Sequence, residues 1–222
     1  EEKKRKETAL KNYYDRTLSF SELIIQIYTN DYLGGYSNLV HEQSGIVALP
    51  LSIYQTLPQP PQGTSFVIDF SSLIILHKIT KEYNIAYPNK FLISTFIVDL
   101  IKQKLRAIKN ELKSEMSVDF STDGVTKYQL PENMQQTNIA YLESLIKWIE
   151  VNCESVVSTK IIEFKRNITL EHEQDSFIDY ILNTILIRED EQALLLTDDL
   201  VYAKFNMLPL QFSISSEKYV KD

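Results

Sequence analysis

Acidic residues follow two short apolar segments of strand length. Asp69 comes directly after the run 66–68, and Asp198 and Asp199 come directly after the run 193–197. In open parallel sheets, ligands bind beyond the carboxyl ends of the strands. If these two strands are neighbours, the carboxylates converge, and converging carboxylates resist burial unless a cation neutralises them. Hard oxygen ligands favour Mg²⁺ or Mn²⁺ over zinc or copper, and such an ion activates water for attack on a phosphoryl group.

The elements that must position these acids alternate between strands and helices after residue 64. Strands are predicted over 65–70, 91–94, 193–197 and 210–214, helices over 73–83, 95–116, 131–151, 173–188 and 200–205, and a hairpin within 117–130 around Asp123-Gly124. Strands of continuous apolar character that alternate with helices indicate a parallel sheet covered on both faces. We therefore expect an α/β fold from residue 64 onward.

The first part of the chain has a different pattern. Residues 1–14 are charged and compatible with a helix, and the apolar spacing over 18–32 predicts a second helix that ends at Gly34-Gly35. The Pro-rich stretch 57–63 is typical of an extended linker. We therefore divide the chain into a helical N-terminal segment (1–56), a linker (57–63) and an α/β domain (64–222).

Composition excludes several classes of protein. The 222 residues carry 23 Lys+Arg and 30 Asp+Glu, so the formal charge is −7, whereas a generic nucleic-acid coat protein should be basic. Cys153 is the single cysteine, which excludes a disulfide framework and a Cys-based zinc site, and the three histidines lack ligand spacing. No apolar run approaches the roughly 20 residues of a membrane helix, and no signal peptide opens the chain. We expect a cytoplasmic protein without membrane contact and, because residue 1 is Glu, a fragment of a larger bacterial polypeptide.

Four segments together resemble the motifs of the PIN-domain ribonucleases. The segment 67–73 around Asp69 is similar to that family's opening strand motif, and 194–199 is similar to its late Thr-(Asn/Asp)-Asp motif. The segment 93–100 resembles the one that bears the second acid, with Asp99 where the family usually has Glu, and 175–178 resembles the third-acid motif. The resemblance covers roughly residues 64–214.

This resemblance implies a three-layer α/β/α sandwich with a central, mainly parallel sheet, and cleavage of single-stranded RNA. It implies one or two Mg²⁺ or Mn²⁺ ions held by three or four acids. The implied metal ligands are Asp69, Asp99, Asp175 and Asp199, and the implied catalytic groups beside them are Asp198 and Asp179. Asp175 and Asp179 share one helical face, and both stay open as the third acid. Chain spacing favours Asp179, but we prefer Asp175, because an acid in the first turn faces the strand ends and the positive end of the helix.

Each piece also has a structural alternative. Asp69 and Asp198 are natural helix N-caps, and Asp99 and Asp175 could lie on solvated helix surfaces. A stretch of basic residues could face RNA, although a solvated helix face is the simpler interpretation. That stretch comprises Lys102, Lys104, Arg106, Lys109 and Lys113.

Three functions are compatible with these residues. The first is a metal-dependent endoribonuclease with carboxylate ligands and no protein nucleophile. The second is a catalytically degenerate module that binds a protein partner or another domain of the parent chain. The third is a metal-dependent phosphoesterase that acts on small molecules.

Overall fold

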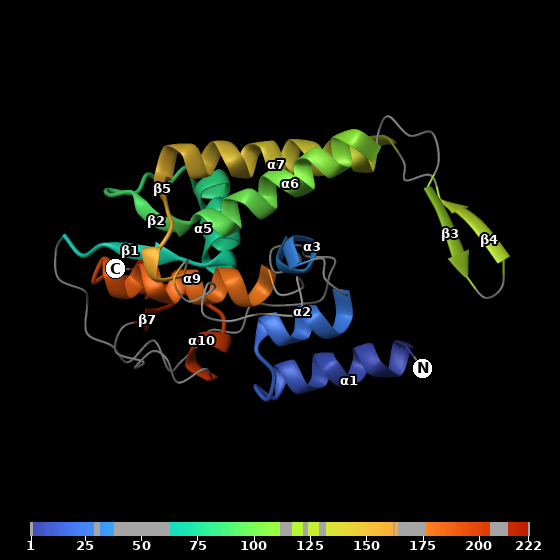
Figure 1. Ribbon diagram of the computed structural model, residues 1–222, viewed down its shortest axis with the longest axis horizontal. Helices are drawn as coiled ribbons and strands as arrows, with labels where there is room; N and C mark the ends of the chain where they lie inside the picture. Colours follow the sequence, from blue (N-terminus) through green and yellow to red (C-terminus); the bar gives the residue numbers. More distant parts are fainter. Residues whose placement is uncertain are drawn as a thin grey trace.

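The computed structural model describes residues 2–28, 32–37, 63–111, 117–121, 124–128, 132–161, 163, 176–204 and 213–221. These residues form a five-stranded parallel sheet with helices on both faces, and a helical unit precedes the sheet in the chain (Figure 1). The predicted three-layer α/β/α fold is therefore confirmed. The predicted linker lies outside the described residues except for Gly63, so the division of the chain at 57–63 stays a prediction.

The sheet has the strand order β5-β2-β1-β6-β7, and all neighbouring strands are parallel. Its strands are β1 (Phe66–Ile68), β2 (Phe91–Ser94), β5 (Cys153–Val156), β6 (Leu194–Leu196) and β7 (Ser213–Ile214). The chain moves outward in one direction from β1 through β2 to β5, and in the other direction from β6 to β7. The direction reverses between β1 and β6, which makes the carboxyl end of this pair the topological switch point of the sheet.

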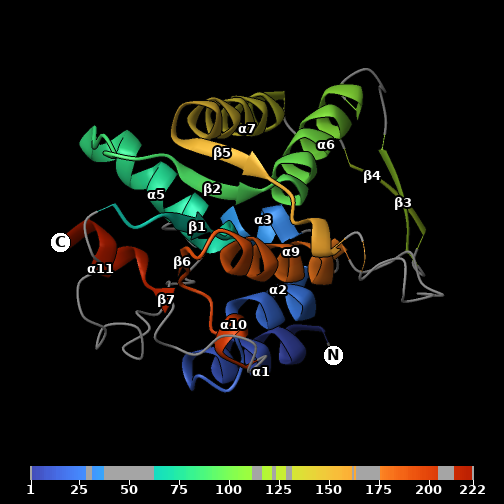
Figure 2. The same ribbon diagram turned by 60° about the vertical axis from the view of Figure 1, so that its left-hand side comes forward.

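Helices cover the two faces as right-handed crossovers require. They are α5 (Phe70–Tyr83), α6 (Thr95–Glu111), α7 (Glu132–Asn152), α9 (Ser176–Asp190) and α11 (Ser216–Lys221), whereas α10 (Val201–Lys204) packs against the N-terminal helix α2 (Phe20–Tyr28). On one face, Trp148 of α7 stacks on Phe91 of β2, and Tyr219 of α11 meets Phe66 of β1 edge to face. On the other face, α9 packs against β1 and β2. Figure 2 shows α7 and α9 on opposite sides of the strands.

The pair α6 and α7 extends beyond the sheet, and an ion pair of 2.6 Å joins Lys109 Nζ to Glu143 Oε1 across it. The predicted hairpin lies at the far end of this pair (Figure 1). It consists of β3 (Ser117–Ser121) and β4 (Gly124–Tyr128), which pair antiparallel.

The structure differs from the sequence prediction at β5. The preceding helix was expected to end near residue 151, but no strand was expected after it. α7 runs to Asn152 and β5 starts at the next residue, with Glu154 and Ser155 exposed. β5 is an edge strand, so it lacks the continuous apolar run that marks the central strands.

The N-terminal unit consists of α1 (Glu2–Tyr14), α2 (Phe20–Tyr28) and α3 (Tyr32–Ser37). The prediction of one helix over 18–32 that ends at Gly34-Gly35 is wrong, because there are two helices and both glycines lie inside α3. A Cβ atom at Gly35 would lie 2.7 Å from two carbons of Ile24. The glycine therefore permits the close approach of α3 to α2 and does not end a helix.

This unit shares its core with the sheet domain. Leu23 and Ile24 of α2 are fully buried in the same hydrophobic cluster as the strand residues. The ring of Tyr36 in α3 stacks on the ring of Phe70 in α5, with 5.1 Å between their centroids. The N-terminal unit thus packs against the start of α5, at the carboxyl edge of the sheet. Across the described residues, no helix is long and apolar enough to cross a membrane.

Candidate metal centre

Asp69 lies at the junction of β1 and α5, where it is the N-cap residue of the helix. Its Oδ1 atom accepts a hydrogen bond of 2.9 Å from the Ser72 amide, and both carboxylate oxygens accept from Ser71 Oγ at 2.8 and 2.9 Å. The side chain is completely buried. The local sequence therefore fixes this carboxylate rigidly at the carboxyl end of β1.

Thr197 connects Asp69 to Asp199. Its hydroxyl donates to Asp69 Oδ2 at 2.7 Å and accepts from the Asp199 amide at 3.0 Å. The underlying strands β1 and β6 are direct neighbours, as the convergence of the two acids requires. The Thr197 hydroxyl thus links the Asp69 carboxylate to the main chain of Asp199 at the topological switch point, where open α/β sheets bind their ligands, and the charge of Asp199 acts on the Asp69 carboxyl group.

Asp199 is also completely buried, and the donors around it come from three helices. Its Oδ1 atom accepts from the amides of Phe20 (3.2 Å) and Val201 (3.1 Å). Its Oδ2 atom accepts from the amide of Ser21 (3.0 Å), from the Ser21 hydroxyl and from the hydroxyl of Tyr36 (3.1 Å). Four of these five donors belong to the N-terminal unit.

The tyrosine hydroxyls near Asp199 form a small network. Tyr36 Oη lies 2.8 Å from the hydroxyl oxygen of Tyr180, which belongs to α9. Burial, reinforced by the neighbouring acidic groups, raises the pKa of Tyr36 well above its usual value. Tyr36 therefore stays protonated and remains a donor to Asp199.

Both carboxyl groups have raised pKa values. Burial raises the pKa of Asp69 from 3.8 to about 7; hydrogen bonds from Ser72 and Thr197 oppose this shift, and the charge of Asp199 adds to it. Burial also raises the pKa of Asp199, against the hydrogen bonds that it accepts. Within the described ranges, none of the ion pairs involves either residue. A bound proton or a bound cation would therefore stabilise the pair.

Asp198 points to a different neighbour. Its carboxylate accepts from the Ser216 amide at the start of α11, at 3.1 and 3.3 Å, and its own amide donates to Ser71 Oγ at 2.9 Å. Adjacent residues at the end of β6 thus face opposite ways, and the Asp199 side chain is the one directed at α2. Asp198 thus links the first turn of α5 to the start of α11.

The other predicted acids are placed less centrally. Asp179 is half-buried in the first turn of α9, next to Tyr180, whose hydroxyl reaches Tyr36. Asp99 lies on the exposed side of α6, and Asp175 lies outside the described residues. In the part of the chain that the structure describes, no three His, Cys, Asp or Glu side chains gather as a metal site. The structure thus brings together Asp69 and Asp199, and the larger ligand set stays a prediction.

The chemistry of this donor set fits a hard divalent ion. Two buried carboxylates supply oxygen ligands and negative charge, which are what Mg²⁺ and Mn²⁺ prefer. The lone pairs of Asp199 are occupied by N–H and O–H donors in this conformation. An ion at Asp199 therefore has to replace donors that come from α2 and α3.

Some contributors to the site could be found in the sequence and others could not. Ser71 and Thr197 lie within the acid-bearing segments, where a hydroxyl next to an acid is a visible signal. Ser21 and Tyr36 contact Asp199 across 178 and 163 residues of chain. No local pattern marks these two residues.

Comparisons with known proteins bear on this geometry. No curated protein and no solved structure matches the chain. A family model described as the PIN domain associated with the TPR-GreAB-C-PIN system matches residues 67–206, which is more than half of the chain. The match includes Asp69, Thr197 and Asp199, and it begins after the N-terminal unit. The chain therefore belongs to the PIN-domain family, as its motifs and its parallel sheet indicated.

Proposed function

We propose that this PIN domain is a divalent-metal-dependent endoribonuclease that hydrolyses phosphodiester bonds of single-stranded RNA. The observation that best supports this function is the position of Asp69 and Asp199 at the switch point of the sheet, where the Thr197 hydroxyl links the Asp69 carboxylate to the Asp199 amide and the charge of Asp199 acts on the Asp69 carboxyl group. Both carboxylates are buried, and among the residues that the structure describes neither pairs with a cationic side chain, so they provide a site with a strong electrostatic preference for a cation.

In this proposal, the acids hold the ion and the surrounding hydroxyls hold the acids. A bound Mg²⁺ or Mn²⁺ would activate a water molecule and neutralise charge on the phosphodiester. Ser71 and Thr197 fix the orientation of Asp69, so its oxygens need little reorganisation when an ion binds. Asp199 provides the facing ligand from β6.

The remaining predicted acids are assigned supporting roles in the same proposal. We keep Asp175 and Asp99 as further ligands, and Asp179 and Asp198 as catalytic groups beside the ion. Asp179 is the best supported of these four, because α9 brings its first turn to the carboxyl edge of the sheet.

Charge distribution supports an RNA substrate. α6 starts at the carboxyl end of β2, on the same edge of the sheet as the two acids. Lys102 and Arg106 are exposed on this helix, whereas Lys109 is paired with Glu143. In a chain of net charge −7, these side chains are a local source of phosphate contacts.

The family description also indicates the setting of this activity. It associates the PIN domain with a TPR-GreAB-C-PIN system. We propose that the chain works together with TPR and Gre domains of that system, as part of a larger polypeptide or as a partner of one. A cytoplasmic location follows from the proposed substrate.

Cleavage of a fluorescent, unstructured RNA in the presence of Mn²⁺ tests the proposed function. Asp69→Asn and Asp199→Asn should each lower the rate by about 100-fold or more, because removal of residues that merely orient metal ligands already costs about 10- to 100-fold. Asp15→Asn is the matched control, since Asp15 is exposed in the turn after α1. Folding of each variant is checked by circular dichroism. Wild-type rates for both site variants would refute a nuclease centre at these acids.

A further inference from the structure

We infer that the N-terminal unit is an internal inhibitor of the metal centre, in which the start of α2 takes the place of the divalent ion at Asp199. This inference rests on the proposed function, because it presupposes that Asp199 is a metal ligand. It is carried by the identity of the atoms around Asp199, most of which come from α2 and α3.

The first turn of α2 has backbone N–H groups that are free of helical hydrogen bonds and point at Asp199. Ser19 and Glu22 form a capping box, in which the Ser19 amide donates to Glu22 Oε2 (2.6 Å) and the Glu22 amide donates to Ser19 Oγ (3.2 Å). The intervening amides of Phe20 and Ser21 have no partner within the helix, and both donate to Asp199. The first turn of a helix carries a partial positive charge. This helix end therefore offsets part of the negative charge of Asp199, at the position where a cation would bind.

The contacts of α2 and of an ion at Asp199 exclude each other. An ionised carboxylate has about four lone-pair sites. Asp199 accepts hydrogen bonds from five donors, two on Oδ1 and three on Oδ2. A metal ion that approaches either oxygen would meet an N–H or O–H group that already points at that oxygen. Binding of the ion therefore requires the start of α2 to move off Asp199.

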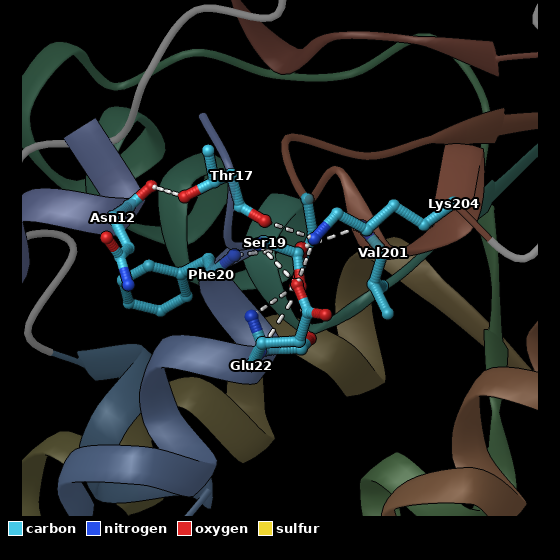
Figure 3. A network of polar contacts seen from close by, with 9 residues as sticks. Asn12, Thr17, Ser19, Phe20, Glu22, Val201 and Lys204 are labelled. Atoms are coloured by element: carbon cyan, nitrogen blue, oxygen red, sulfur yellow. Dashed lines mark hydrogen bonds and ion pairs between the residues drawn. The ribbon is translucent and has the colours of Figure 1, made fainter. Parts of the chain in front are cut away.

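A second contact holds α2 in this position from the surface. Lys204 of α10 donates to the carbonyl oxygen of Thr17 at 2.7 Å and pairs with Glu22 Oε2 at 2.5 Å (Figure 3). α10 begins two residues after Asp199, so the same loop carries both contacts with α2. The Lys204 and Glu22 side chains are about one third exposed, at 34% and 37%, so this ion pair is a weak restraint. It can be removed without altering any group that touches Asp199.

The inhibitor is a separate part of the chain from the PIN motifs. The family match starts at residue 67, after α1, α2 and α3. The start of α2 and the metal ion compete for the Asp199 carboxylate, so each weakens the binding of the other by the same factor. Displacement of the N-terminal unit would open the metal centre, and occupation by metal would release α2.

The experiment uses the full chain, with Mn²⁺ as the probe, and combines calorimetric titration with amide hydrogen exchange. Ser21→Ala removes one charge-assisted hydrogen bond to Asp199 and should raise Mn²⁺ affinity by about tenfold. Lys204→Met removes the surface contact and should raise the affinity by about two- to fivefold. Lys109→Met is the control, because it makes the same substitution in another surface ion pair, between α6 and α7. It should leave the affinity unchanged.

Hydrogen exchange reports directly on the displaced helix. In the wild-type chain, saturating Mn²⁺ should speed the exchange of the Phe20 and Ser21 amides, whereas those in the centre of α7 should not respond.

Two results would overturn the inference, and they are distinguishable. Equal Mn²⁺ affinity in the wild type, Ser21→Ala and Lys204→Met, with unchanged exchange at α2, would leave a metal centre that α2 does not control. If none of these proteins bound Mn²⁺, the metal centre would be rejected, and the proposed competition between α2 and the ion would be rejected as well. Lys204→Met keeps the test valid if Ser21→Ala does not fold, because Lys204 lies at the surface.

Discussion

Replacement of Asp69 by Asn is expected to stabilise the metal-free protein. The rise of the Asp69 pKa from 3.8 to about 7 corresponds to roughly 4 kcal/mol of destabilisation at pH 8, where the buried carboxylate is charged. Asn resembles the protonated acid in shape and is a good N-cap, so it can still accept from the Ser72 amide. We therefore expect Asp69→Asn to gain about 2–4 kcal/mol in unfolding free energy at pH 8.

The same shift fixes the sign of the pH dependence. The folded pKa is raised, so the stability that protonated Asp69 provides is fully present below about pH 4 and is lost as the pH rises to about 7. The raised pKa of Asp199 acts in the same direction. The advantage of Asp69→Asn should therefore be near zero at pH 4 and largest above pH 7.

Urea denaturation in EDTA between pH 4 and pH 8 measures this effect. Trp148 is the single tryptophan and is buried against Phe91, so its fluorescence reports on the core. Asp15→Asn serves as the control for the loss of one acidic residue at the surface. The reasoning is refuted if Asp69→Asn is less stable than the wild type at pH 8, or if the difference between them does not change with pH.

Three further predictions concern other parts of the molecule. Asp199→Asn should lose about 1–3 kcal/mol in thermal or urea unfolding, because its NH₂ group would face N–H donors; a gain in stability would contradict the hydrogen-bond network. Gly35→Ala should lose about 1–3 kcal/mol, since its Cβ would lie 2.7 Å from Ile24, and Ile24→Ala in the same chain should relieve the clash; additive losses would argue against this contact. Lys102→Ala with Arg106→Ala should weaken RNA binding and its salt dependence in filter-binding assays while Mn²⁺ affinity stays constant; unchanged RNA binding would exclude α6 from the RNA path.

The central strands could be predicted because their burial is visible in their amino-acid sequences. β1 and β6 are buried on both faces, so they are continuous apolar runs, and each is followed by the acid that the fold places at its carboxyl end. β5 lies at the edge of the sheet with two exposed residues, and nothing in its four residues distinguishes it from a helix end. Gly34-Gly35 predicted a helix end because glycine has a low helix propensity. The reason for glycine inside α3 is a tertiary contact, since Ile24 fills the space beside Gly35, and local sequence does not show that contact.

The candidate site was predictable to the extent that it is local. Asp69 and Asp199 each follow a strand, and their convergence was predicted on the condition that those strands are neighbours, which the structure shows. The contacts of Ser21 and Tyr36 depend on how α2 and α3 dock against α10 and α5, which is a property of tertiary packing. Sequence patterns thus located the acids but not the groups that cover them.

The central claim is that Asp69 and Asp199 hold a divalent ion when the start of α2 withdraws. An anomalous-scattering map from crystals of the full chain grown with Mn²⁺ tests this claim most directly. We expect a manganese peak within coordination distance of both carboxylates, with the amides of Phe20 and Ser21 moved away from Asp199. Saturating Mn²⁺ with no peak between these carboxylates, and with Asp199 still bonded to α2, would contradict it.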